Sequence, residues 1–229
     1  MEGFQPNGVA SLDIFFANYQ ALTHLTIFDY PIIMVIWNLL LLVVPFFLVW
    51  VLMKYWKKNR LKKFHQQVIA LFLGLLWLLF IPNAAYVITD ARHIITVCSD
   101  DIYHWACPAK AWAILFFFTY ALVGWLAFVY LMRQMRDFLK KVNQELVPIL
   151  PVFVIPLISI GIMLGLINRW NSWEFFLDPV GLVKNIIFYF THLSYFVNWL
   201  IFSVFLYILY WIGDCFLQDF AKIRKKSKK

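Results

Sequence analysis

Charged residues are scarce in this chain of 229 residues: they make up 14% of the sequence, whereas 63% is hydrophobic and 20% is aromatic. A soluble globular domain carries about 25% charged residues, so the composition excludes that class. Several uncharged runs reach the roughly 20 apolar residues that a bilayer-spanning helix needs. These runs are continuous, which disfavours a transmembrane β-barrel with its alternating pattern. We therefore predict an all-α protein, a polytopic bundle of transmembrane helices.

The chain also lacks the short motifs that identify many enzymes. It contains no His-Glu-x-x-His zinc motif, no Walker loop and no Gly-x-Ser-x-Gly element. Cysteines are few, and two of the three, Cys98 and Cys107, fall in a predicted outer loop where a disulfide is permitted. The sequence leaves open whether that disulfide forms. No short motif in the sequence therefore identifies a reaction class.

Basic residues outnumber acidic ones by 20 to 12, which gives a formal net charge of +8. Most of them gather in three clusters, within Lys54–Lys63, Arg133–Lys141 and Lys222–Lys229. This is the distribution of the positive-inside rule, so the surplus reports topology and we expect no nucleic-acid partner. The clusters are placed to contact anionic lipid headgroups on the cytoplasmic side of the bilayer.

Five spans follow from the apolar runs and the basic clusters. Their expected ranges are residues 31–53, 68–88, 111–132, 147–167 and 186–212. The odd number places Met1 outside and Lys229 inside. Three regions result: residues 1–30, a helical bundle over 31–217, and a basic cytoplasmic tail over 218–229. Within the first region, residues 9–28 form either an interfacial helix or a sixth span, and the interfacial helix is favoured because no basic residue anchors Met1 inside.

Polar side chains gather in the stretch Ile81–His93, directly after an uncharged run. On a helix with 100° per residue, four of them fall within about 80° of one another; they are Asn83, Tyr86, Asp90 and His93. Polar groups near a bilayer are costly and usually have a partner or a purpose. Pro82 crowds the carbonyl of Leu78, so we expect a kink or break there, with Asn83 serving the freed carbonyl.

A second polar set lies at the end of the fourth span; its members are Arg169, Asn171, Trp173 and Glu174. The second and fourth spans both run outward, so the two sets should lie at the same depth. Asn38 lies about 10 Å inside the first span at 1.5 Å per residue, and His192 lies at a comparable depth in the fifth. Apart from Asn198, the middle and inner halves of the spans are expected to be almost bare of polar groups.

Capping signals place two helix starts after the fourth span. Asn171 followed by Glu174 resembles a capping box and predicts a short interfacial helix. Asp178-Pro179 has the N-cap and first-turn residues of a second helix. We expect that second helix to continue without a break into the fifth span. Prolines in the fourth span should bend or fray its start.

Structural roles compete with functional ones for these residues. Asp90 and Arg169 would form an ion pair joining two helix ends. Asn38 and Asn83 are favoured as hydrogen-bond partners between helices. Tyr86 and Trp173 would be aromatic anchors at the membrane interface.

In the functional alternative, Asp90 and His93 are catalytic, as general base or as ligands of a divalent metal. His192, His104 or Glu174 would complete the metal shell. Arg169 would hold a phosphate or a carboxylate. The remaining polar residues of the two sets, with Asn38, would bind substrate or support the site.

Two of these stretches resemble motifs of a known family, domain of unknown function 1361. Residues 81–90, Ile-Pro-Asn-Ala-Ala-Tyr-Val-Ile-Thr-Asp, followed by His93, are similar to its Pro-Asn-Ala-Pro-Tyr-x-x-Thr-Asp-x-x-His element. Residues 169–174, Arg-Trp-Asn-Ser-Trp-Glu, resemble the family's Arg-Trp-Asn-Ser-Trp-Asp element. Asp178-Pro179 resembles its nearby Asn-Pro, and residues 37–39 resemble its Trp-Asn-Leu. The resemblance implies a bacterial plasma-membrane protein and supports the choice of residues, and it supplies no reaction.

Three hypotheses of function follow. The first is an envelope enzyme that works from the outer leaflet on a lipid headgroup or a lipid-linked precursor. The second is a non-catalytic membrane subunit that stabilises another envelope protein, whose identity the sequence does not give. The third is a small-solute transporter, which ranks last because transporters place polar groups near the midplane.

Overall fold

The computed structural model describes residues 26–27, 30–59, 63–96 and 111–226. Five helical segments are long and apolar enough to cross a membrane: Ile32–Asn59, Phe64–Arg92, Trp112–Val142, Leu146–Ile167 and Leu193–Asp219. The predicted all-α bundle with five spans is confirmed, and the chain is a multi-pass membrane protein. Most of the expected N-terminal helix, residues 9–28, lies outside the described residues. Its described part, Thr26–Ile27, is a short strand (β1) that pairs antiparallel with Tyr30–Pro31 (β2).

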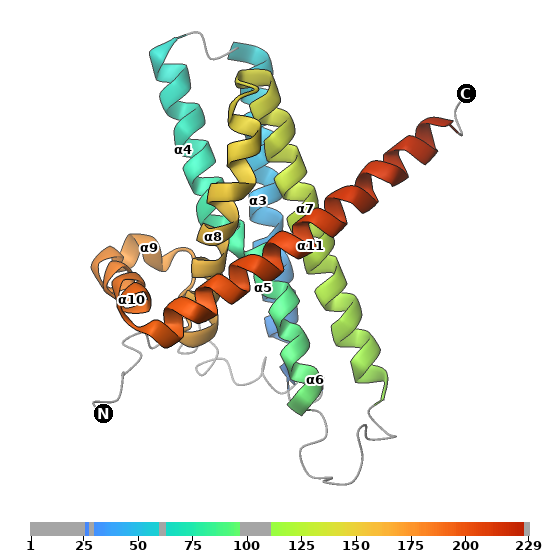
Figure 1. Cartoon of the computed structure of the whole chain (residues 1–229), viewed down its shortest axis with the longest axis vertical. Helices are drawn as coiled ribbons and strands as arrows, with labels where there is room; N and C mark the ends of the chain where they lie inside the picture. Colours follow the sequence, from blue (N-terminus) through green and yellow to red (C-terminus); the bar gives the residue numbers. More distant parts are fainter. Residues whose placement is uncertain (1–25, 28–29, 60–62, 97–110, 227–229) are drawn as a thin grey trace.

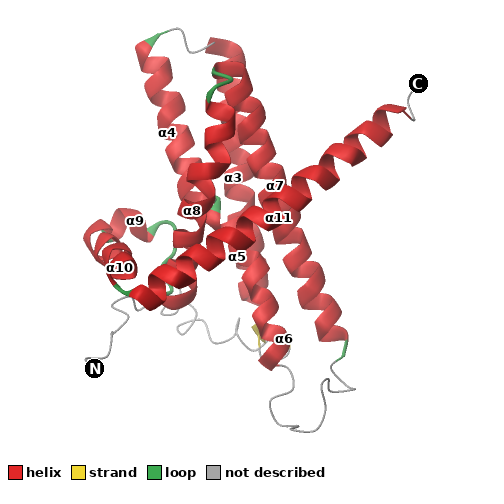
Figure 2. Cartoon of the chain, viewed as in Figure 1, coloured by secondary structure: helices red, strands yellow, loops and turns green. Residues whose placement is uncertain are grey.

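The bundle consists of near-parallel helices crossed by one oblique helix (Figure 1). The helices along the long axis are α3 (Ile32–Asn59), α4 (Phe64–Phe80), α7 (Trp112–Val142) and α8 (Leu146–Ile167). The oblique helix is α11 (Leu193–Lys226). Helix dominates the described part of the chain (Figure 2). Large apolar side chains such as Phe47, Leu71 and Trp211 are exposed on the outer surface, where a bilayer would cover them.

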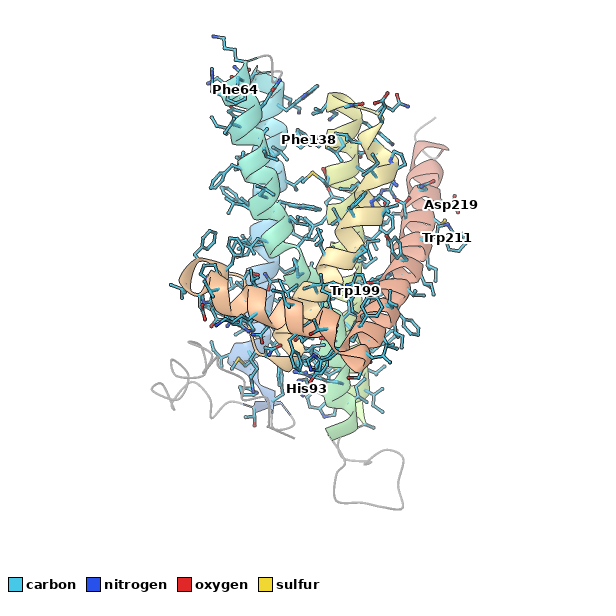
Figure 3. The ribbon with its side chains drawn as sticks, turned by 60° about the vertical axis from the view of Figure 1, so that its left-hand side comes forward. Phe64, His93, Phe138, Trp199, Trp211 and Asp219 are labelled. Atoms are coloured by element: carbon cyan, nitrogen blue, oxygen red, sulfur yellow. The ribbon has the colours of Figure 1, made fainter. Side chains whose placement is uncertain are left out.

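The two ends of the bundle differ in chemistry. Figure 3 places Phe64 and Phe138 at one end and His93 at the other. The first end, here named the basic end, includes the last turns of α3 and α7 with Lys57, Lys58, Lys140 and Lys141. The opposite end, with His93, is named the motif end.

The second span breaks at Pro82, as predicted. α4 ends at Phe80, and α5 (Pro82–Thr89), the 3₁₀ turn η1 (Asp90–Arg92) and α6 (His93–Thr96) follow. Asn83 Nδ2 donates to the Phe80 carbonyl at 3.0 Å, so the expectation that it serves Leu78 was wrong. A Cβ on Gly161 of α8 would lie 2.7 Å from Pro82 Cγ, so only glycine lets α8 approach the break this closely.

The expected helix starts after α8 are present. Asn171 N donates to Glu174 Oε2 at 2.6 Å, and α9 (Glu174–Leu177) follows. Asp178 caps α10 (Pro179–Thr191), because its Oδ1 accepts from Gly181 N at 2.8 Å.

The predicted continuous helix from Asp178 into the fifth span was wrong. α10 ends at Thr191 and α11 begins at Leu193, because the His192 backbone is extended, with φ −109° and ψ 115°. The Thr191 hydroxyl and His192 Nδ1 lie 3.1 and 2.9 Å from the Phe188 carbonyl. These polar side chains add to the His192 N–H, which donates to the same carbonyl at 3.1 Å and closes the last turn of α10.

α8 continues through its prolines, supported by side chains of α11. Pro156 has no N–H for the Val152 carbonyl, and the Tyr207 hydroxyl donates to that carbonyl at 2.8 Å. Between the same two helices, Ser203 Oγ donates to Ser159 Oγ at 3.1 Å inside the core. The expected fraying of α8 is therefore absent: its helix runs from Leu146 through both internal prolines.

Candidate functional site

Three segments that are far apart in the sequence meet at the motif end. Asn83 Nδ2 of α5 donates to Ser172 Oγ, in the loop after α8, at 3.0 Å. Trp37 of α3 and Trp173 of the same loop make an edge-on ring contact, with centroids 5.9 Å apart. The two polar sets and the first span therefore share one site, as the predicted topology required.

Asp90 lies at the centre of this site and is completely buried, with 0% of its surface exposed. Its Oδ2 accepts from Asn38 Nδ2 at 3.0 Å and from the Tyr30 hydroxyl at 3.5 Å. Its Oδ1 has no hydrogen bond and lies 3.9 Å from His93 Nε2. The expected ion pair with Arg169 is absent from these contacts, so that prediction was wrong.

His93 is half-buried against two aromatic rings. Its ring centroid lies 4.2 Å from that of Tyr30 and 5.7 Å from that of Phe117. Burial, and then the positive charge of Arg92, lower the pKa of His93, so the imidazole is neutral at pH 7 and able to accept a proton. Burial and the charge of Asp90 raise the pKa of Tyr30, which keeps its phenol protonated as a donor.

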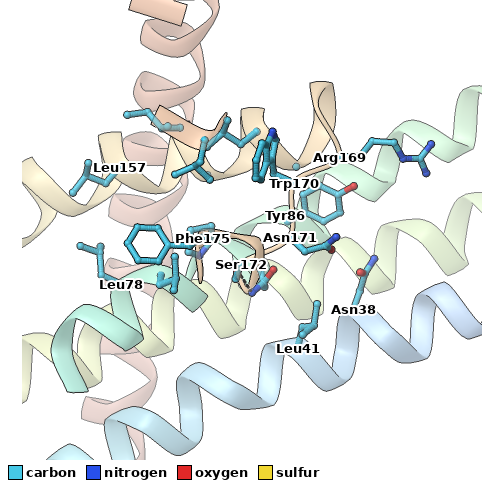
Figure 4. Close-up of a pocket in the computed structure, with 18 of the residues that line it drawn as sticks. Asn38, Leu41, Leu78, Tyr86, Leu157, Arg169, Trp170, Asn171, Ser172 and Phe175 are labelled. Atoms are coloured by element: carbon cyan, nitrogen blue, oxygen red, sulfur yellow. Dashed lines mark hydrogen bonds between the residues drawn. The ribbon is translucent and has the colours of Figure 1, made fainter. Parts of the chain in front are cut away.

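A cavity of about 1000 Å³ opens beside these residues (Figure 4). This volume is at the upper end of the roughly 300–1,000 Å³ typical of ligand pockets. Its polar lining consists of Asn38, Asn83, Tyr86, Arg92, His93, Arg169, Asn171 and Ser172. In Figure 4, Arg169 and Tyr86 lie toward one side of the cavity, and Leu78, Leu157 and Phe175 toward the other. One cavity thus joins a polar end to an apolar end.

The backbone of the loop after α8 is unusual at Arg169. This residue has a left-handed conformation, with φ 59°, and Trp170 N donates to the Leu164 carbonyl at 3.1 Å. Glycine or asparagine normally occupies such a position, and another residue costs about 1–2 kcal/mol there. The turn presents Arg169 and Asn171 to the cavity, whereas Glu174 is engaged in capping.

Of the predicted metal ligands that the structure describes, Asp90 and His93 alone come together, with Oδ1 and Nε2 3.9 Å apart. Within the described residues, no group of three His, Cys, Asp or Glu side chains is arranged to hold a metal ion. His192 is exposed at the α10–α11 junction, where its ring stacks on Phe188 with centroids 3.7 Å apart. His104, with Cys98 and Cys107, lies outside the described residues.

Two contributors to the site were not singled out from the sequence, Tyr30 and Arg92. Tyr30 precedes the first span, and nothing local links it to residue 90. Arg92 was assigned to a loop, yet it directly precedes His93 and its Nε donates to His93 Nε2 at 3.5 Å. Trp173 packs on Trp37 and does not line the cavity. Trp37 lines the cavity in its place.

A second polar cluster joins α7 to α11 nearer the basic end. Arg136 Nη1 and Nη2 donate to the Asp214 carboxylate at 2.7 and 2.9 Å, and Arg133 Nε lies 3.6 Å from the same group. These residues lie just beyond the expected third and fifth spans, 111–132 and 186–212, and within the longer apolar helices Trp112–Val142 and Leu193–Asp219. An aspartate two residues after the expected end of an apolar span was the available signal, since an acidic residue at a bilayer needs a cationic partner.

The comparisons with known proteins give one finding. A family model described as "Protein of unknown function (DUF1361)" matches residues 37–210. The match covers Asn38, the 81–93 stretch and the 169–174 loop. No curated protein and no solved structure matches the chain.

Proposed function

The chain belongs to the DUF1361 family, whose description names no activity, and we propose that it is a membrane enzyme acting on the headgroup of a lipid or a lipid-linked precursor. The supporting observation is the cavity, which joins an apolar end to a polar end that contains His93. An amphiphile has the same division into tail and head. The proposed setting is a bacterial plasma membrane, with the basic end in the cytoplasm and the cavity in the outer leaflet.

His93 is the proposed proton acceptor. It lines the cavity, and its neutral ring is able to take a proton from a water or from a headgroup hydroxyl. Asp90 does not line the cavity and is instead a positioning residue. Its free Oδ1 faces His93 Nε2 and stabilises the imidazolium that forms, while Asn38 and Tyr30 hold its other oxygen.

Lipid profiling of a deletion strain tests the proposed chemistry. We expect a lipid or lipid-linked precursor to accumulate in the deletion strain and to return to normal with the wild-type protein. His93→Gln should leave the precursor accumulated at normal protein abundance, because it removes the proton acceptor and keeps a polar side chain. The matched control is His65→Gln, an exposed histidine near the start of α4, which should restore the profile fully. A normal profile with His93→Gln would remove the catalytic role.

A non-catalytic membrane subunit is the second candidate. The bonds from Asn38 and Tyr30 to Asp90 tie α3 and β2 to η1, which is what a purely structural cluster would do. In that case Asp90→Asn lowers protein abundance and function in parallel. A catalytic site instead predicts that function is lost without a change in protein abundance, as for an inactive His93→Gln variant present at normal abundance.

A further inference from the structure

We infer that the ligand of the cavity is a phosphate-bearing amphiphile whose acyl chain enters sideways from the bilayer, past α4, α9 and α10. The inference rests on the proposed function for the site and adds the ligand's class and route. It concerns binding, and the chemistry of His93 plays no part in it. Its evidence is the composition of the cavity's mouth, the two faces of α10 and the charges at the polar end.

Residues that both line the cavity and remain exposed mark its mouth. The apolar ones are Phe72 and Leu75 of α4, Leu157 of α8, Phe175 and Phe176 of α9, and Phe190 of α10. These side chains lie on helices that present apolar groups to the surroundings, so this part of the mouth opens to hydrocarbon. A solute from water would have to cross that apolar rim, whereas an acyl chain already lies beside it.

α10 forms a wall between the cavity and the bilayer. Leu182, Ile186 and Phe190 line the cavity at a spacing of four residues, which is one face of a helix. Val183 and Ile187 are exposed on the remaining surface. Figure 3 shows α10 lying across the bundle, unlike the spans that run along it. Apart from the exposed Lys184, these outer residues are apolar like those that line the cavity, which suits a chain on one side and membrane lipid on the other.

The polar end of the cavity is lined by two cationic side chains. Among the described residues that line the cavity, Arg92 and Arg169 are cationic and none is Asp or Glu. Both arginines line the same cavity as Tyr86. Guanidinium groups bind phosphate oxygens with paired donors. Arg169 also occupies a left-handed position that glycine would fill without strain, and such strain concentrates at functional sites.

Lipid binding to the purified protein in nanodiscs tests this inference. The probes are phosphatidylglycerol, phosphatidylcholine and inorganic phosphate, with occupancy measured by native mass spectrometry. We expect one phosphatidylglycerol per chain, at least fivefold preferred over phosphatidylcholine. Leu75→Trp should reduce occupancy about tenfold by filling the mouth. The control is Leu71→Trp, one turn away on α4: both leucines are exposed, 64% for Leu71 and 55% for Leu75, and only Leu75 lines the cavity.

Arg169→Gly separates a ligand role from a structural one. A binding role predicts lost preference for phosphatidylglycerol together with unchanged or higher thermal stability, because glycine relieves the left-handed strain. Lys184→Gln, which removes an exposed cation from α10 that does not line the cavity, should keep the preference. A stability loss with unchanged lipid preference would overturn the phosphate-recognition role.

Other outcomes identify other ligands. Inorganic phosphate that binds alone and displaces the lipid completely would assign the site to a free anion and overturn the acyl-chain route. Equal effects of Leu75→Trp and Leu71→Trp would also overturn that route. If phosphatidylglycerol binds as expected while His93→Gln restores a normal lipid profile, the proposed chemistry fails and this inference stands.

Discussion

At the scale of single residues, the two oxygens of Asp90 have different surroundings. Oδ2 accepts two hydrogen bonds, whereas Oδ1 is buried without a hydrogen bond and lies 3.9 Å from His93 Nε2. A buried carboxylate oxygen without a donor is costly. The cost falls when His93 takes up a proton, because an imidazolium beside Oδ1 is a charged partner. Asp90 therefore stabilises the imidazolium that forms when a ligand supplies the proton, and it acts against the burial and the Arg92 charge that lower the pKa of His93.

His93 should also make the stability of the protein depend on pH. Its pKa in the folded protein is lowered by burial and by Arg92, below the roughly 6.5 of an unfolded chain. Between these two values the unfolded chain binds the additional proton, so the free energy of unfolding decreases as pH falls below about 6.5. The loss is complete below the folded pKa, and above about 6.5 this residue adds no pH dependence.

The measurement is the melting temperature of the detergent-purified protein from pH 8 to pH 5. His93→Gln should flatten the profile in this range relative to wild type, whereas His65→Gln should reproduce it. Asp90, Arg92 and Tyr30 are unchanged in both variants, so the difference between them isolates the imidazole. Parallel profiles for wild type and His93→Gln would count against a lowered pKa.

At the scale of elements, helix ends that depend on neighbouring residues in the sequence were predictable. Helix ends that depend on side-chain contacts were not. Pro82 breaks the second span because its ring and missing N–H act on its own helix, and Asp178 caps α10 in the same local way. At the break, the side chains of Thr191 and His192 make bonds to the Phe188 carbonyl. An isolated histidine in an apolar run does not reveal those bonds, so the fifth span was predicted without a break.

The Arg136–Asp214 pair should be the strongest single polar link between α7 and α11. Asp214→Ala leaves the Arg136 fork without its carboxylate, and we expect a loss of about 3–5 kcal/mol in the free energy of unfolding. Replacing both residues, as Arg136→Met with Asp214→Leu, should recover most of that loss, since an apolar pair of similar volume is often neutral. Unfolding in detergent by denaturant titration measures both.

An exposed ion pair on the same helix is the control for this prediction. Lys140 Nζ lies 3.8 Å from Asp137 Oδ1, with side chains 52% and 53% exposed. Lys140→Ala should change stability by less than about 1 kcal/mol. If Asp214→Ala has an equally small effect, the α7–α11 cluster is not a structural link.

At the scale of the whole molecule, the sequence predicted which residues form the site better than it predicted their partners. Helical spacing gave the shared face of Asn83, Tyr86, Asp90 and His93, and counting spans brought the 169–174 loop to the same end. Periodicity does not show which neighbour faces a side chain. Asp90 was therefore matched to Arg169, the obvious opposite charge, while the folded chain gives it Asn38 and Tyr30.

Membrane orientation decides which leaflet supplies the ligand. The basic end carries the lysines of α3 and α7, so we predict from the positive-inside rule that it faces the cytoplasm and that the motif end faces outside. Two single-cysteine variants test this after Cys98, Cys107 and Cys215 are changed to serine. Gln144→Cys lies in the turn between α7 and α8, and Ser194→Cys lies in the first turn of α11; both native side chains are exposed.

An impermeant maleimide should label Ser194→Cys in intact cells and Gln144→Cys only after permeabilisation. The expected asymmetry follows from five spans and from the clustering of Lys and Arg at one end. The reverse pattern would place the cavity in the inner leaflet, and its phosphate-bearing ligand would then be a lipid of the cytoplasmic face. The labelling result and the lipid-binding result are independent, because the chemistry of the cavity does not depend on which side it faces.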